Sequence, residues 1–183
     1  METNATIEAA PPMALASGVR EDQFARMMRD HGPSVARLAS AYERNPASRD
    51  DLVQDIALAL WRALPSFRGE CSERTLVFRI AQNRALTHSS LRRRADSRTV
   101  DDPPDVADKR ATPEMEASAS QLRERLLEAV RSLPDGHREV MALLLEGMTN
   151  GEIGEVLGIS EGNVAVRATR ARKELRERLG DLR

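Results

Sequence analysis

The sequence predicts an all-α protein of two small helical domains joined by a flexible linker. Aromatic residues make up only 3% of the 183 residues and charged residues 31%, a composition typical of helical rather than sheet proteins. Apolar residues recur at three- and four-residue spacing through most of the chain. A segment rich in proline and acidic residues, 96–117, separates two such stretches.

The first domain is expected over residues 21–95. It follows a tail, residues 1–20, whose small, polar and proline-containing composition predicts disorder. Apolar stripes interrupted by "HGPS", "NPASRDD" and "SFRGECSERT" mark its helices and loops. Ser48 or Asp50 is expected to cap the helix that begins near "NPASRDD", because a side-chain oxygen there can accept a bond from an unpaired amide.

The second domain, residues 118–183, ends in a predicted helix-turn-helix. Thr149 can cap its first helix, Gly158 can supply the left-handed turn, and Ser160 can cap the second helix. In a DNA-binding helix-turn-helix, the N-terminal end of the second helix enters the major groove. The residues expected to contact duplex DNA are Ser160, Glu161, Asn163, Ala165, Val166, Arg167, Arg170 and Lys173. A plain helical hairpin with a solvated charged face would show the same pattern and remains an alternative.

Charge is distributed unevenly along the chain. The formal net charge of −1 argues against a general nucleic-acid coat. Arginines nevertheless dominate residues 67–98, whereas acids dominate residues 99–119, so two basic patches are separated by an acidic spacer. This arrangement favours two local nucleic-acid contacts.

Several function classes are excluded by what the sequence lacks. No apolar run approaches the roughly 20 residues of a membrane span, and the N-terminus does not resemble a signal peptide, so a cytoplasmic location is expected. The single cysteine, Cys71, permits no internal disulfide, and the three histidines lack metal-ligand spacing. No phosphate loop, nucleophile motif or carboxylate pair is present. We therefore expect no metal, no cofactor and no enzymatic activity.

Three segments occur in an order that identifies a family. They are "DDLVQDIALALWRALPSFRGE", "RTLVFRIAQNRALTHSSLRRR" and "LPDGHREVMALLLEGMTNGEIGEVLGISEGNVAVRATRARKEL". Over residues 21–179 the chain resembles bacterial sigma factors of the extracytoplasmic-function (ECF) group of the sigma-70 family. The resemblance implies a sigma region 2 domain and a sigma region 4 domain. It implies a non-enzymatic factor that binds core RNA polymerase and directs transcription initiation, with region 2 melting and reading the minus ten element and region 4 reading the minus thirty-five element.

The resemblance also implies roles for residues that match the family's motifs. The polymerase-binding set is Asp51, Gln54, Asp55, Trp61 and Arg62. The minus ten set is Phe67, Arg68, Gly69, Phe78, Arg79, Asn83, Arg84, Arg92 and Arg93. The chain departs from the family pattern at Leu76, where tryptophan is usual, and at Ala165, Val166 and Gly154, where lysine, serine and alanine are common. Leu76 removes a stacking group from the melting surface, so we expect either that cations hold the DNA more or that weaker promoters melt poorly. Altered promoter reading is expected from Ala165 and Val166, and a looser helix from Gly154.

The partners implied are core RNA polymerase, through its beta-prime clamp helices and beta flap, promoter DNA and an anti-sigma factor, without membrane insertion. Two alternatives stay open. The chain can be a sigma-like interaction protein that sequesters an anti-sigma factor without directing transcription. It can also be a stand-alone helix-turn-helix regulator of duplex DNA.

Overall fold

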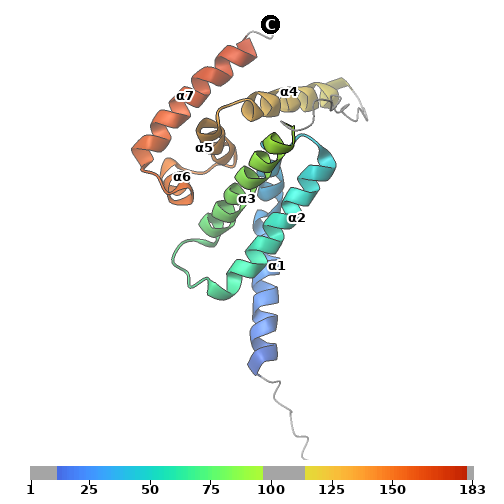
Figure 1. The fold of residues 1–183 in the computed structure, drawn as a ribbon, viewed down its shortest axis with the longest axis vertical. Helices are drawn as coiled ribbons and strands as arrows, with labels where there is room; N and C mark the ends of the chain where they lie inside the picture. Colours follow the sequence, from blue (N-terminus) through green and yellow to red (C-terminus); the bar gives the residue numbers. More distant parts are fainter. Residues whose placement is uncertain (1–11, 97–113, 181–183) are drawn as a thin grey trace, which may run out of the picture.

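The structure is a computed structural model that describes residues 12–96 and 114–180, and within these ranges it is helical with no strand (Figure 1). The elements are α1 (Pro12–Ser40), α2 (Pro46–Ala63), the short 3-10 helix η1 (Leu64–Ser66), α3 (Glu73–Asp96), α4 (Glu114–Arg131), α5 (Asp135–Leu145), α6 (Asn150–Leu157) and α7 (Glu161–Gly180). The all-α prediction is confirmed for the described residues. None of the helices in these ranges combines the length and the apolar character that crossing a bilayer requires.

Two helices begin earlier than the sequence analysis expects. α1 begins at Pro12, inside the expected tail 1–20, of which residues 1–11 lie outside the described residues. Proline suits the first turn of a helix because its missing amide hydrogen has no intrahelical partner there. α4 begins at Glu114, inside the expected linker 96–117, of which residues 97–113 lie outside the described residues. A glutamate in the first turn favours this start through the helix dipole.

The start of α2 corrects a predicted cap. Asn45, rather than Ser48 or Asp50, caps the helix, because its side chain accepts a bond of 3.1 Å from the backbone amide of Ser48. Pro46 then occupies the first helical position. The structure therefore places the cap three residues before the earlier of the two expected candidates.

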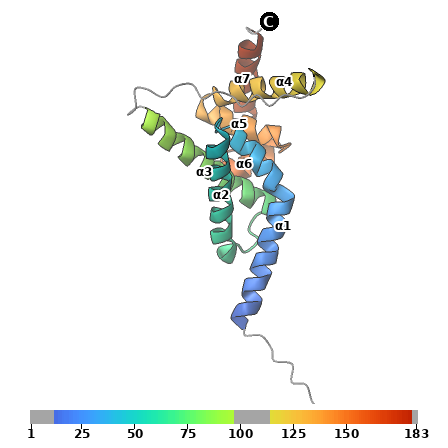
Figure 2. The same cartoon turned by 90° about the vertical axis from the view of Figure 1, so that its right-hand side faces the viewer.

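The first domain packs α1, α2 and α3 against one another (Figure 2). Their inward faces supply its buried core, which includes Met27, Val35, Leu38, Leu52, Ile56, Leu60, Val77, Phe78, Ala81 and Ala85. Within each helix these residues recur at the spacing of one helical face. The N-terminal part of α1 projects beyond the other helices (Figure 1).

The second domain packs α4 to α7, and α7 lies across α4, α5 and α6. The inward face of α7 consists of Val164, Ala168, Ala171 and Leu175, all buried. Small residues at two of these positions let the helix approach its neighbours closely. The opposite face of α7 is therefore left for solvent or a partner.

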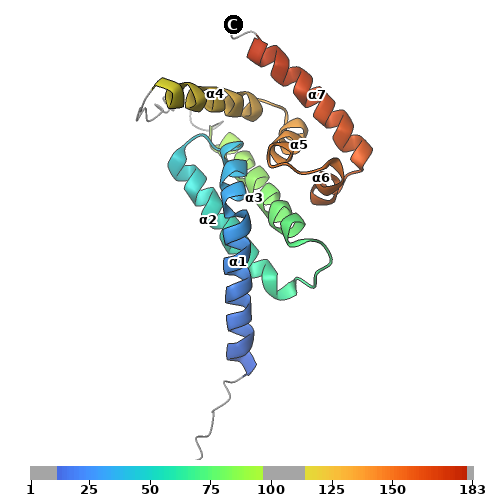
Figure 3. The same ribbon diagram turned by 180° about the vertical axis from the view of Figure 1, so that it is seen from behind.

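The two domains are in contact through α3, which packs against α5 and α6. Figures 1 and 3 show α5 and α6 between α3 and α7. The buried apolar side chains of both domains form one continuous cluster. We call this the closed arrangement.

Candidate nucleic-acid and polymerase interfaces

The helix-turn-helix is formed by α6, the turn at Gly158 and Ile159, and α7. Thr149 caps α6 in a capping box: its hydroxyl accepts a 3.3 Å bond from the Glu152 amide, and the Glu152 carboxylate accepts a 2.7 Å bond from the Thr149 amide. The Thr149 amide and the Thr149 hydroxyl, which donates a 2.9 Å bond, both stabilise the Glu152 carboxylate and lower its pKa. Gly158 has φ 67°, the left-handed conformation expected from the sequence, and Ser160 accepts a 3.3 Å bond from the Asn163 amide. All three predicted caps and turns are confirmed.

Gly154 has a packing role that the sequence analysis missed. It is buried, and an ideal Cβ there would lie 2.8 Å from the carbonyl oxygen of Ile159. The Ile159 amide also donates a 3.1 Å bond to the Gly154 carbonyl. The missing side chain thus lets the turn pack directly on α6, which is a different role from the looser helix expected.

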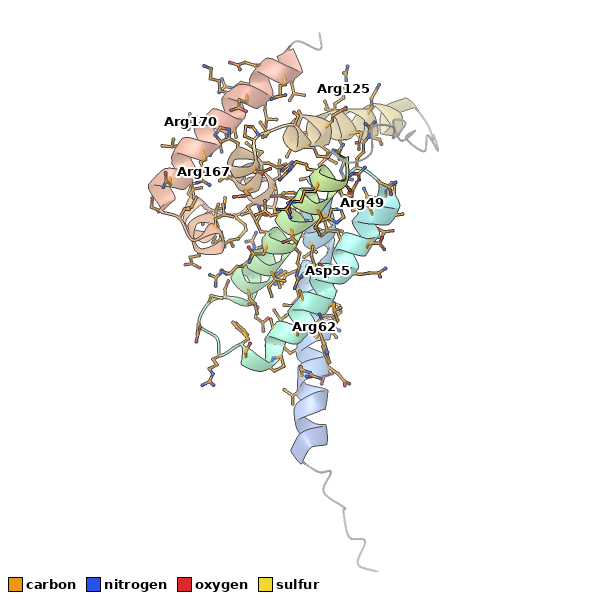
Figure 4. The ribbon with its side chains drawn as sticks, in the orientation of Figure 1. Arg49, Asp55, Arg62, Arg125, Arg167 and Arg170 are labelled. Carbon is orange, nitrogen blue, oxygen red and sulfur yellow. The ribbon has the colours of Figure 1, made fainter. Side chains whose placement is uncertain are left out.

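The outward face of α7 carries most of the residues expected to contact duplex DNA. Those exposed are Ser160, Glu161, Asn163, Ala165, Val166, Arg170 and Lys173. Arg167 differs, since its guanidinium packs over Gly136 of α5 and lies 4.0 Å from the Glu139 carboxylate. Burial raises the pKa of Glu139, and the nearby Arg167 charge opposes that rise. Arg167 thus serves the α5–α7 contact, while Arg170 is exposed on α7 (Figure 4).

The outward face of α2 carries four of the five expected polymerase-binding residues. Asp51, Gln54, Asp55 and Arg62 are all exposed, and Figure 4 shows Asp55 and Arg62 along this helix. Leu58 lies among them and is 45% exposed. Leu58 was not among the residues expected from the sequence, although it lies four residues after Gln54 and four before Arg62 and so shares their helical face.

Trp61 lies elsewhere, against α1. Its ring meets Phe24 edge to face at a centroid distance of 5.4 Å, and the Arg20 guanidinium stacks 4.0 Å from its centroid. An aromatic pair and a cation–π contact of this kind hold α1 on α2. Trp61 therefore has a packing role between α1 and α2, and its contact with polymerase stays a prediction.

The loop before α3 contains Phe67, Arg68 and Gly69. Arg68 and Gly69 are exposed and Phe67 is half-buried, and Gly69 has φ 77°, which lets the loop turn sharply. Phe78 was expected to contact the minus ten strand, but it is only 1% exposed. Phe78 falls on the same helical face as Ala81 and Ala85 and points with them into the core of the first domain. The expected contact between Phe78 and the minus ten strand is therefore wrong in this arrangement.

The cations of α3 are mostly engaged within the chain. Arg79 donates a 2.9 Å bond to the carbonyl of Glu155 in α6, and Arg93 lies 3.1 Å from the carboxylate of Asp135 in α5. Arg84 lies 3.8 Å from Asp55 of α2. Asn83 is exposed. The structure does not bring the expected minus ten residues together as one open surface.

Arg92 contacts Glu43, whose side chain is 1% exposed. Glu43 also accepts bonds of 2.8 Å from His88 Nε2 and from the Asn45 amide. Burial by itself acts to raise the pKa of Glu43, but these hydrogen bonds outweigh it and the pKa lies below its ordinary value. The carboxylate therefore joins the end of α1 to α3 while it stays charged.

Further polar contacts cross between the two domains. Arg37 of α1 forms a bidentate pair with Glu146, with N···O distances of 2.7, 3.0 and 3.2 Å. Arg74 of α3 donates a 2.8 Å bond to the Glu146 carbonyl and lies 3.4 Å from Glu152. Arg138 stacks over Tyr42 at 5.0 Å from the ring centroid. These contacts hold the closed arrangement on both sides of α3.

Within the described residues, no cluster of histidine, cysteine or acidic side chains has the geometry of a metal site. Cys71 is a free, partly exposed thiol in the loop before α3.

Comparison with protein families gives two matches. The family model described as Sigma-70 region 2 matches residues 27–96, and the one described as Sigma-70, region 4 matches residues 123–175. The first covers the C-terminal half of α1 together with α2 and α3, and the second covers the C-terminal half of α4, all of α5 and α6, and most of α7.

Individual proteins match over most of their length. The chain is 33% identical over 166 residues to RNA polymerase sigma factor CarQ of Myxococcus xanthus, covering 88% of this chain and 90% of CarQ. It is 30% identical over 171 residues to the ECF RNA polymerase sigma factor SigM of Mycobacterium tuberculosis, covering 92% of this chain and 84% of SigM. It is also similar to CnrH, solved in complex with the cytosolic domain of CnrY, with a TM-score of 0.68 and 27% identity over 92% of this chain and 94% of CnrH.

Proposed function

The chain belongs to the extracytoplasmic-function group of the sigma-70 family and directs promoter-specific transcription as an alternative sigma factor, and from this premise we propose how its surfaces divide the work. α2 binds core RNA polymerase, α3 and the loop before it contact the minus ten element, and α7 contacts the minus thirty-five element. The factor adds no catalytic group of its own and acts in the cytoplasm, where the polymerase is.

The observation that carries this proposal is the exposed stripe on α2. Asp51, Gln54, Asp55, Leu58 and Arg62 share one outward face, and four of them are polar. An apolar residue with a polar rim is the usual composition of a protein-binding hot spot. A regulator that used only its helix-turn-helix would have no use for such a face in its first domain.

Contact with the minus ten strand requires the closed arrangement to open. Arg79 and Arg93 bond to α6 and α5, so separation of the two domains frees their guanidinium groups for DNA. We propose that binding to polymerase, with α2 on the beta-prime clamp helices and the second domain on the beta flap, holds the domains apart. Phe67 and Arg68 are then the stacking and charged groups of the loop, which suits capture of an unpaired base.

An anti-sigma factor is the proposed negative regulator. Among solved structures, the sigma factor RpoE is held in complex with the anti-sigma factor NepR from Bartonella quintana, and its fold matches this chain with a TM-score of 0.66 at 19% identity over 86% of this chain and 97% of RpoE. A partner that stabilised the closed arrangement would keep Arg79 and Arg93 from the promoter.

The test is run-off transcription with purified core RNA polymerase and a library of genomic promoter fragments. Wild-type protein is expected to give specific transcripts, and Leu58→Glu and Arg170→Ala to reduce them. Leu58→Glu should act by weakening polymerase binding, and Arg170→Ala by weakening promoter binding at unchanged polymerase affinity. Polymerase binding without any transcript would favour a sigma-like protein that occupies an anti-sigma factor. Absence of polymerase binding would leave a stand-alone DNA regulator.

A further inference from the structure

The N-terminal half of α7 presents an apolar side chain where solvent or DNA would be expected to meet polar groups. Val166 is 48% exposed. The buried face of the helix is formed by Val164, Ala168, Ala171 and Leu175. At about 3.6 residues per turn, Val166 lies nearly opposite the centre of that buried face. Core packing therefore does not account for the valine, which sits where a helix-turn-helix meets the major groove.

The residues beside Val166 add methyl groups rather than hydrogen-bonding groups. Ala165 is exposed and ends in a methyl group. Thr169 is exposed, but its hydroxyl donates a 2.9 Å bond to the Ala165 carbonyl, so its polar end is already used. We call Ala165, Val166 and Thr169 the methyl patch of α7.

Polar residues lie on both sides of the methyl patch. Asn163 is exposed one turn before it, and Arg170 and Lys173 are exposed after it, Lys173 with a 75% exposed side chain. Cations at these positions suit phosphate contacts, which give affinity without reading sequence. The patch itself has charge on its rim and none at its centre, so it suits an apolar feature of a base edge.

We propose that the methyl patch, with Val166 at its centre, reads the C5-methyl group of a thymine in the duplex minus thirty-five element. In the major groove, thymine alone among the four bases presents a methyl group, and apolar side chains are the ones that contact it. The inference rests on the proposed function of α7 and adds the chemical feature that it recognises. It implies a promoter with a thymine, on either strand, at the base pair facing Val166.

Uracil tests the proposal directly, because it pairs as thymine does and lacks only the methyl group. Promoters found by run-off transcription are resynthesised with single thymine-to-uracil replacements across the minus thirty-five region of each strand. Binding of the complete holoenzyme to each duplex is then measured by competition. Wild-type protein is expected to lose about three- to four-fold in affinity at one or two positions, the loss corresponding to one buried methyl group.

Two variants separate a specific reading from a general effect. Val166→Ser removes the apolar group at an exposed site without a helix-propensity penalty, so it should fold normally and lose the discrimination between thymine and uracil. Val19→Ser is the matched control, since Val19 is a 69% exposed valine on α1, and it should discriminate as wild type does. Holoenzyme binding that is indifferent to every uracil replacement, or discrimination between thymine and uracil that survives in Val166→Ser, would overturn this inference alone. Absence of transcription from every template would overturn the proposed function and this inference together.

Discussion

Replacing Glu146 with glutamine is expected to shift the chain from the closed arrangement toward an open one. Glu146 ends the α5 segment, and its side chain is only 4% exposed although it pairs with the half-exposed Arg37. Glutamine keeps the shape of the side chain and removes its charge. The bidentate ion pair across the domain boundary is thereby reduced to a contact between the Arg37 guanidinium and one uncharged amide oxygen.

The size of the effect follows from the geometry of the pair. Exposed ion pairs contribute about 0.2–1 kcal/mol, and the bidentate contact at 2.7–3.2 Å with a covered carboxylate places this one at the upper end. A loss of about 1 kcal/mol lowers the ratio of closed to open molecules about five-fold. Arg79 and Arg93 bond to the second domain only in the closed arrangement. When the closed state predominates, the affinity of the free protein for single-stranded minus ten DNA should therefore rise by up to the same factor of about five.

Single-molecule energy transfer measures the ratio. One dye is attached at Cys71, the natural cysteine, and the other at a cysteine introduced at the exposed Gln121 of α4. Arg37→Ala should have the same effect as Glu146→Gln, and the double variant should add little, as a double-mutant cycle requires. Asp30→Asn, which removes an exposed charge on α1, serves as the control. Equal closed populations in wild type and Glu146→Gln would refute the reasoning.

Three further outcomes are expected. Glu43→Gln should lower the free energy of unfolding at pH 7 by about 1–3 kcal/mol, because the Arg92 guanidinium loses its charged acceptor. The pKa of Glu43 is lowered in the folded state, so its contribution to stability is present above the ordinary value of 4.5 and is lost as the pH falls below that value. Acid should therefore narrow the difference in unfolding free energy between Glu43→Gln and wild type, measured by urea unfolding. Gly158→Ala should cost about 1–2 kcal/mol in thermal unfolding, because its φ of 67° disfavours a side chain. Leu58→Glu should lower affinity for core polymerase with little change in melting temperature, whereas Trp61→Ala should lower the melting temperature.

Each of these outcomes has a result that contradicts it. A constant difference between Glu43→Gln and wild type from pH 7 down to pH 3 would show that the carboxylate charge is not what stabilises the domain. Unchanged melting of Gly158→Ala would mean that the turn relaxes out of the left-handed conformation. If Trp61→Ala melted like wild type and lost polymerase binding, Trp61 would be a polymerase anchor after all.

Local patterns in the sequence were enough to predict the helix-turn-helix. Thr149, Gly158 and Ser160 act on the amides and backbone angles of their immediate neighbours, so their roles do not depend on distant parts of the chain. The outward face of α2 was equally accessible, because helical periodicity alone separates Asp51 and Asp55 from the buried stripe. The fold class and both domains followed from the same periodicity and from recognisable motif blocks.

Tertiary structure decided the partners of the long side chains. Whether Arg79 is free or bonded to Glu155 depends on α6 lying against α3, and α6 begins more than 50 residues after α3 ends. The resemblance implied contact roles for Phe78 and Trp61, but which face of a helix is covered depends on the neighbour that packs there. A helix repeat fixes which residues share a face, since it arises from bonds within the segment, whereas the occupant of that face is set by packing between segments distant in sequence.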